Sequence, residues 1–207
     1  MDKAWINAQL GTLISDLQDH ISDRDDFYFE PTEEIYTSLE SGDENQLKDL
    51  VTQISKKLKI EPMPTIEYCW GVQLGLDTAG QYTLGYSTRH IKIPFYYVGR
   101  KYALGCILAH ELSHALLMPK GIGIDMTDES SRLLNEMLTD LASILLGLGK
   151  LLINGIFVPV NNLDVMKIGY LSEELIGYSY KRIEEIMILD KGLSRKNLIP
   201  RALKLLE

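Results

Sequence analysis

Two histidines and a glutamate interrupt an otherwise apolar stretch, and their types and spacing could bind and use a metal ion. Residues 102–118 have the sequence YALGCILAHELSHALLM, which contains His110, Glu111 and His114. Residues four apart on a helix differ by about 40° around its axis, so both imidazoles project from one face. Two such nitrogens can reach a single zinc ion at roughly 2.0–2.1 Å. Glu111 lies about 100° away, where its carboxylate could act on a metal-bound water, as in the His-Glu-x-x-His pattern of zinc hydrolases.

A catalytic zinc held by two histidines needs a third protein ligand, and the next predicted helix offers one. We expect this helix to begin near Thr127 or Asp128, either of which is a good N-cap residue, and to run to about Gly147. On a helical wheel Glu136 and Asp140 lie side by side on a narrow polar stripe, with apolar side chains opposite. Twenty-one residues separate His114 from Glu136, enough to turn and bring the second helix alongside the first.

The polar stripe predicts both a ligand and a residue that supports a ligand. Glu136 would complete a His-His-Glu set, and Asp140 would accept a hydrogen bond from the non-ligating nitrogen of one imidazole and so fix its tautomer. Asp140 as the ligand in place of Glu136 is the alternative. A solvated helix face is the ordinary explanation of such a stripe, but the preceding histidine helix favours a site.

The two segments resemble the gluzincin clan of zinc metallopeptidases, the thermolysin-like group, in which an Asn-Glu-x-x-x-Asp segment follows the His-Glu-x-x-His helix. The matching residues are His110, Glu111, His114, Asn135, Glu136 and Asp140. The resemblance covers about residues 62–148. It implies that His110, His114 and Glu136 bind Zn²⁺. It also implies that Glu111 is the general base and that Asp140 orients His110.

The chain departs from related patterns at two points. A metzincin would carry glycine and histidine where this chain has Leu117 and Lys120, so that branch is excluded. Thermolysin-like enzymes have an oxyanion-stabilising histidine in a C-terminal lobe, whereas no histidine follows Glu136 here. A phenol can donate to an oxyanion as an imidazole does, and we favour Tyr178 for this catalytic role, although it could simply pack its helix. The other candidates are Tyr170, Tyr180, Arg182, His90 and Arg89.

The periodicity of the remaining sequence predicts an α+β fold. Residues 3–22, 33–39 and 43–59 have helical spacing, which ends at Pro62 and Pro64, and the aromatic residues 27–29 could dock on the main body. Strand-like runs follow at 66–74, 81–86 and 90–93, and predict an antiparallel or mixed sheet ahead of the histidine helix. Residues 158–162 are expected to form a loop, and Ser172 to cap a helix ending near Leu189.

We therefore expect a helical N-terminal region, residues 1–61, followed by a zincin-like core with C-terminal helices, residues 62–207. In that core the small sheet precedes the histidine helix and the Glu-ligand helix. The expected function is zinc-dependent hydrolysis of a peptide or protein substrate. The alternative is a zinc-binding regulatory or interaction protein of the same fold with little or no peptidase activity, which the missing histidine and the acidic N-terminal helices favour.

Composition narrows the classes of partner and compartment. The net charge of −8 and the sequence pI near 5.1 argue against a nucleic-acid partner, which would require clustered lysine and arginine. No run of about 18 apolar residues predicts a membrane span, and the first residues do not have the pattern of a signal peptide. The two cysteines, Cys69 and Cys106, do not predict a disulfide scaffold. We expect a cytoplasmic protein.

Overall fold

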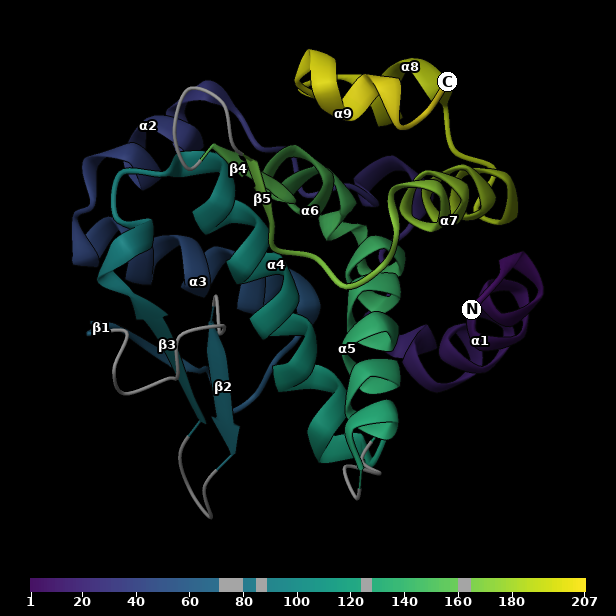
Figure 1. The fold of residues 1–207 in the computed structure, drawn as a ribbon, viewed down its shortest axis with the longest axis horizontal. Coiled ribbons are helices and arrows are strands. Elements are labelled where there is room, and N and C mark those ends of the chain that lie inside the picture. Colours follow the sequence, from purple (N-terminus) through teal and green to yellow (C-terminus); the bar gives the residue numbers. More distant parts are fainter. Residues whose placement is uncertain (71–79, 85–88, 124–127, 160–164) are drawn as a thin grey trace.

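Helix α4 (Lys101–Leu117) lies near the centre of the fold, and many of the other elements pack against it (Figure 1). The computed structural model describes residues 1–70, 80–84, 89–123, 128–159 and 165–207. Every residue of α4 from Ala103 onwards is buried. A helix enclosed by other elements is apolar on all sides, which explains the composition of this stretch.

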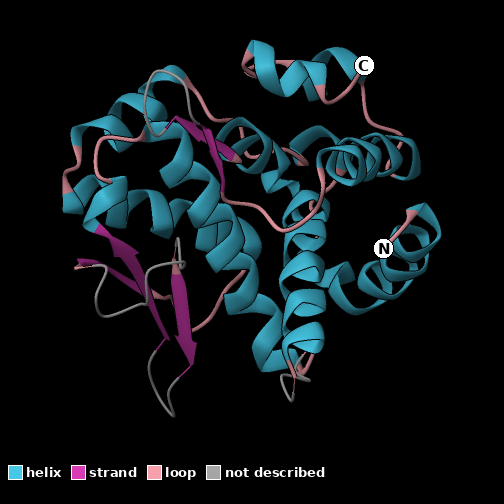
Figure 2. Ribbon diagram, viewed as in Figure 1, coloured by secondary structure: helices cyan, strands magenta, loops and turns pink. Residues whose placement is uncertain are grey.

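The described elements follow one another along the chain as an α+β fold in which helix predominates (Figure 2). The helices are α1 (Lys3–Leu17), η1 (Gln18–His20), η2 (Arg24–Asp26), α2 (Glu33–Ser41), α3 (Glu44–Leu58), η4 (Phe95–Tyr97), α4, η5 (Met118–Lys120), α5 (Glu129–Ser143), η6 (Ile144–Leu148), α6 (Gly149–Gly155), α7 (Glu173–Ile186), α8 (Lys191–Arg195) and α9 (Pro200–Lys204). The strands are β1 (Thr65–Cys69), β2 (Gln81–Leu84), β3 (Arg89–Pro94), β4 (Phe157–Pro159) and β5 (Val165–Lys167).

A three-stranded mixed sheet precedes α4, as predicted. The strand order is β1–β3–β2, with β1 parallel and β2 antiparallel to β3. Strand β2 therefore forms one edge of this sheet, and it packs against α4. The predicted strands 66–74 and 81–86 also include residues 71–74 and 85–86, which lie outside the described residues.

The N-terminal aromatic segment docks where α5 gives way to α6. Between these helices, Gly147 in the π-helical turn η6 has a φ of 81°. A Cβ at this glycine would lie 1.9 Å from the carbonyl oxygen of Phe27, so only glycine fits. Phe29 N–H donates to Gly147 O at 2.9 Å, and the buried ammonium of Lys150 pairs with Glu30. Phe27 is almost fully buried, which confirms the predicted docking.

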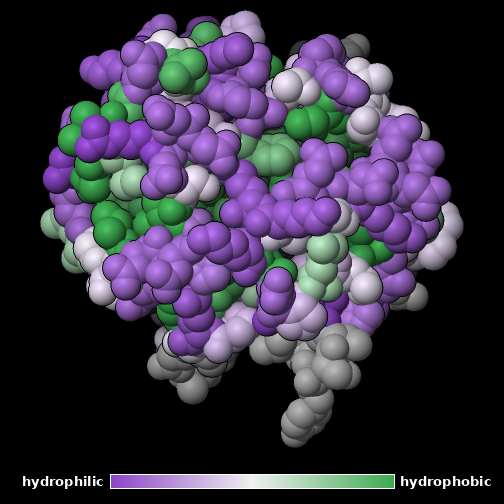
Figure 3. All heavy atoms as spheres, turned by 180° about the vertical axis from the view of Figure 1, so that it is seen from behind, coloured by the Kyte–Doolittle hydropathy of each residue, from purple (hydrophilic) through white to green (hydrophobic). Residues whose placement is uncertain are grey.

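Side chains from both sides of residue 61 share one hydrophobic core in the described part of the chain. Ile6 of α1 and Leu47 of α3 belong to the same buried cluster as Leu108 of α4 and Leu141 of α5. The sequence boundary at residues 61 and 62 therefore marks a change from helix to strand within that core. On the outside, hydrophilic residues cover most of the face seen in Figure 3.

The C-terminal third differs from the sequence prediction in two places. Strand β4 occupies residues 157–159, where a loop beginning at Val158 was expected, and it pairs antiparallel with β5. The rest of that predicted loop, residues 160–162, lies outside the described residues. Ser172 caps α7 as predicted, but the helix ends earlier because Ile188 adopts a left-handed conformation and Leu189 N–H bonds back to Glu184 O.

Among the described residues, none of the helices combines the length and the apolar character that crossing a membrane would require.

Candidate metal centre

Three potential metal ligands from α4 and α5 converge on one point. His110 Nε2 lies 2.8 Å from Glu136 Oε2, and His114 Nε2 lies 3.1 Å from the same oxygen. The two Nε2 atoms are 3.1 Å apart. Both imidazoles are buried, whereas the Glu136 side chain keeps 18% of its surface exposed. The structure therefore brings together the His-His-Glu set that the sequence predicted, and part of the Glu136 side chain reaches solvent.

Hydrogen bonds between the two helices hold these ligands in position. Asp128 caps α5 by accepting from Ser131 N–H at 2.9 Å. In the buried contact between α4 and α5, Ser143 Oγ lies 2.8 Å from Ser113 Oγ and 3.1 Å from Ala109 O, so this hydroxyl joins the two helices. Because these contacts lie about one turn from His110, they fix how the histidine helix sits against the glutamate helix.

Each imidazole uses its other nitrogen in a bond that leaves Nε2 free for a metal. His110 Nδ1 donates to Asp140 Oδ1 at 2.9 Å, as predicted, which makes Asp140 a supporting residue while Glu136 faces the imidazoles. Thr139 Oγ1 lies 3.3 Å from His114 Nδ1 and donates its own hydrogen to Asn135 O. The threonine oxygen must therefore accept from His114. In both neutral rings Nε2 then carries the lone pair, and such partners are typical of histidines that bind metals.

The electrostatics of the cluster favour a bound cation. Burial by itself lowers the pKa of His110, but the hydrogen bonds to Asp140 and Glu136 outweigh this effect and raise the pKa to about 10. Burial raises the pKa of Glu136, yet the two imidazoles hold it below its ordinary value overall. Without a metal, His110 therefore keeps a proton between two carboxylates, in the place where a cation would neutralise the same charges.

Glu111 lies beside the cluster and is contacted by strand β2. Its carboxylate is buried, and burial raises its pKa above the ordinary value, while the backbone N–H of Tyr82 acts in the opposite direction. The start of the strand approaches very closely, since a Cβ at Gly80 would lie 2.7 Å from Glu111 Oε1 and 2.7 Å from Ile107. The helix and the strand together fix the carboxylate next to the three ligands.

Tyr170 covers the cluster on another side. Its ring stacks on the His110 ring, with centroids 5.4 Å apart and planes at 30°. Its N–H and that of Leu171 donate to Asp140 Oδ2 at 2.6 and 2.9 Å. Burial and the charges of Glu136, Glu111 and Asp140 raise the pKa of Tyr170. The phenol is therefore protonated at neutral pH.

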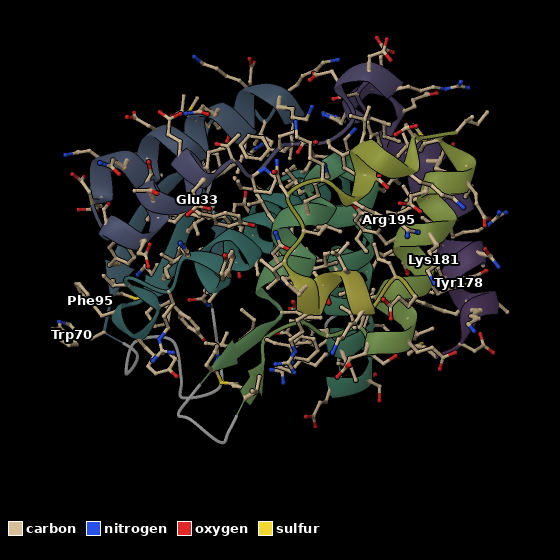
Figure 4. All side chains as sticks on the ribbon, turned by 90° about the horizontal axis from the view of Figure 1, so that it is seen from above. Glu33, Trp70, Phe95, Tyr178, Lys181 and Arg195 are labelled. Atoms are coloured by element: carbon tan, nitrogen blue, oxygen red, sulfur yellow. The ribbon has the colours of Figure 1, made fainter. Side chains whose placement is uncertain are left out.

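Tyr178 lies elsewhere, which corrects the assignment made from the sequence. Its hydroxyl accepts from Asn7 Nδ2 at 2.9 Å, and the ammonium of Lys3 lies over its ring. Figure 4 labels Tyr178 beside α1, on the face of α7 that meets this helix. Helical periodicity gave no indication of which face of α7 would meet α1, and Tyr178 is on that face.

Some contacts of the site were not anticipated from the sequence. The contact of Thr139 could have been predicted from the sequence, because this residue immediately precedes Asp140 on the predicted ligand helix. The approach of Gly80 and Tyr82 to Glu111 could not, because it involves backbone atoms of a short strand. Cys106, one turn before His110, is fully buried and is not among the converging ligands.

The donor atoms fit a zinc ion. Three donors placed tetrahedrally at about 2.0–2.1 Å from one zinc are roughly 3.3 Å apart. The observed separations are 2.8, 3.1 and 3.1 Å, so small side-chain shifts suffice. Two neutral imidazoles and a carboxylate are a known catalytic zinc set. No model of a protein family, no curated protein and no solved structure matches this chain.

Proposed function

We propose that this protein is a zinc-dependent peptidase, with His110, His114 and Glu136 as ligands and Glu111 as general base. The observation that carries the proposal is the convergence of three donor atoms within 3.1 Å of one another, beside a buried carboxylate. A purely structural zinc site is closed by four protein ligands, whereas a catalytic site has three and an open position. Among the described residues, three potential ligands converge, which is the number found in catalytic sites.

Each residue of the site has a specific part in this chemistry. Bound zinc would supply a water of lowered pKa and would polarise the carbonyl of the scissile bond. Glu111 takes a proton from the attacking water and later passes it to the leaving nitrogen as the carbon–nitrogen bond breaks. The raised pKa of Glu111 suits both steps, because a group that accepts and then returns a proton works best when its pKa is near the ambient pH.

Strand β2 is suited to hold an extended substrate beside Glu111. It is an edge of the sheet, and Tyr82 N–H points away from β3 toward Glu111. Backbone groups two residues apart along a strand point the same way, so the N–H and C=O of Leu84 face the same side as those of Tyr82. A peptide that pairs there would lie along the cluster, by β-strand addition.

The arrangement of elements supports a zincin-like core. A mixed sheet precedes the histidine helix α4, its edge strand contacts that helix, and the glutamate helix α5 packs alongside. The hydrogen bond from His110 to Asp140 is the one that the gluzincin resemblance implies for these positions.

The test is zinc content and peptide cleavage for wild type, Glu111→Gln and a matched control, Glu129→Gln. Glu129 lies in the exposed first turn of α5, so the control removes the same charge away from the cluster. We expect one zinc per chain in all three proteins, cleavage of a peptide library by wild type and the control, and none by Glu111→Gln. Cleavage by Glu111→Gln would refute the assigned base. Zinc without cleavage by wild type would favour the regulatory or interaction protein instead.

A further inference from the structure

Residues 169–171 cross the site and are anchored to the residue that supports a metal ligand. The backbone N–H groups of Tyr170 and Leu171 both donate to Asp140 Oδ2, while Asp140 Oδ1 accepts from His110. Asp140 is fully buried, so these two amides supply hydrogen bonds that water cannot. The position of Tyr170 is therefore fixed relative to His110 through one shared carboxylate.

The side chain of Tyr170 extends from this anchor over the His110 ring. The centroids of the two stacked rings are 5.4 Å apart, and their planes are 30° from parallel. Tyr170 is nevertheless 40% exposed, so a substrate that approaches the partly exposed Glu136 can reach it. Its hydroxyl makes no hydrogen bond within residues 1–70, 80–84, 89–123, 128–159 and 165–207, although the hydroxyl hydrogen can rotate to meet an acceptor.

The other donors considered from the sequence are already engaged. Tyr178 accepts from Asn7, and the Tyr180 hydroxyl donates to Ser194 O at 2.7 Å. The remaining candidates also have partners: Arg182 pairs with Glu185, His90 bonds Thr65, and Arg89 donates to Ala115 O. Of these residues, Tyr170 is the one that stacks on a proposed ligand.

Peptide hydrolysis passes through a state with a negatively charged carbonyl oxygen, to which this phenol can donate a hydrogen bond. When the water oxygen bonds to the carbonyl carbon, the π electron pair of the C=O bond moves onto the carbonyl oxygen. That oxygen is then negative until the pair re-forms the double bond and the leaving nitrogen departs with the proton from Glu111. A fixed hydrogen-bond donor that faces this oxygen stabilises the transition state without being consumed.

We propose that Tyr170 is a catalytic residue whose hydroxyl donates a hydrogen bond to the carbonyl oxygen of the scissile peptide as that oxygen becomes negative. This inference rests on the proposed function. It gives the chain, which has no histidine after Glu136, a donor from the segment between β5 and α7.

Three variants separate the hydroxyl from the ring. Tyr170→Phe keeps the stack on His110 and removes the donor, Tyr170→Leu removes both, and Tyr178→Phe is the matched control on α7. The first readout is kcat and KM for a cleaved peptide. The second is the calorimetric affinity of the zinc-loaded proteins for a phosphinic peptide, whose charged tetrahedral oxygens mimic the transition state. The third is zinc affinity, measured by competition with a chelator.

For Tyr170→Phe we expect kcat to fall about 10²–10³-fold, with KM and zinc affinity close to those of wild type. Its affinity for the phosphinic peptide should fall together with kcat/KM, and Tyr178→Phe should match wild type in every readout. If Tyr170→Phe keeps wild-type kcat and phosphinic affinity, and only Tyr170→Leu is impaired, Tyr170 merely packs on His110 and the inference is wrong. If zinc-loaded wild type neither cleaves peptides nor binds the phosphinic peptide, the proposed function fails, and the inference fails with it.

Discussion

Replacing Asp140 with asparagine removes one charge at nearly constant shape, and we expect it to weaken zinc binding through His110. Asp140 accepts from His110 Nδ1 at 2.9 Å and from the N–H groups of Tyr170 and Leu171 at 2.6 and 2.9 Å. Asparagine has a single acceptor oxygen. The backbone groups can only donate, so the oxygen stays with them and the NH₂ group faces His110. The imidazole must then accept at Nδ1 and carry its proton on Nε2, the nitrogen that would bind the metal.

The size of the effect follows from the loss of this partner. Removing a carboxylate that orients a metal-binding histidine lowers metal affinity about 10–100-fold, or roughly 1.4–2.7 kcal/mol. In the metal-free protein Asp140 and Glu136 together raise the pKa of His110 to about 10, so the variant should titrate closer to the ordinary value of 6.5. Both changes arise from one buried carboxylate, and they should occur together.

The assay combines chelator competition for zinc with ¹⁵N NMR of the histidine rings, which distinguishes the two tautomers. Asp128→Asn is the control, because Asp128 is an exposed cap on the same helix and asparagine caps equally well. We expect the control to keep wild-type zinc affinity. Asp140→Asn with unchanged zinc affinity, or with the proton still on Nδ1 of His110, would show that the tautomer argument is wrong.

Three further predictions concern pH and the edge strand. Because the pKa of His110 is about 10, a metal that binds at lower pH must displace a proton from this imidazole. The zinc Kd should therefore fall about tenfold for each unit by which the pH rises between roughly 7 and 9. A pH-independent Kd would contradict this prediction. In the metal-free protein the same raised pKa should contribute stability below about pH 6.5 that is lost as pH rises toward 10, as urea unfolding would measure. Gly80→Ala should push Glu111 aside and lower kcat by up to about 10²-fold with normal zinc content, because its Cβ would lie 2.7 Å from that carboxylate. Wild-type kcat in this variant would mean that the strand shifts without moving the base.

Local patterns in the sequence indicated the two site helices well, because a 3.6-residue period places side chains directly. The His-Glu-x-x-His spacing and the stripe of Glu136 and Asp140 predicted which side chains share a face, and the structure joins those faces. The contacts of the C-terminal segment depend on tertiary packing. Strands β4 and β5 have only three residues each, too few for an alternating pattern, so the path that leads Tyr170 to His110 left no periodic signal.

The same limit explains the choice of Tyr178 over Tyr170 from the sequence. A helix wheel ranks residues within α7, but it does not show that α1 covers one face of this helix. Tyr170 precedes the helix and is positioned by two backbone hydrogen bonds to a carboxylate 30 residues earlier in the chain. Backbone donors do not depend on side-chain identity, so no residue type marked this contact.

The two amides that bind Asp140 also set an order of events during synthesis. A ribosome delivers His110, His114 and Glu136 before residues 169–171, so the nascent chain carries all three proposed ligands while Asp140 Oδ2 lacks its final partners. The site is completed only when residue 171 has left the exit tunnel and the segment has closed over the carboxylate. The order of synthesis therefore places the C-terminal third of the chain, which supplies none of the three proposed ligands, last in the assembly of this cluster.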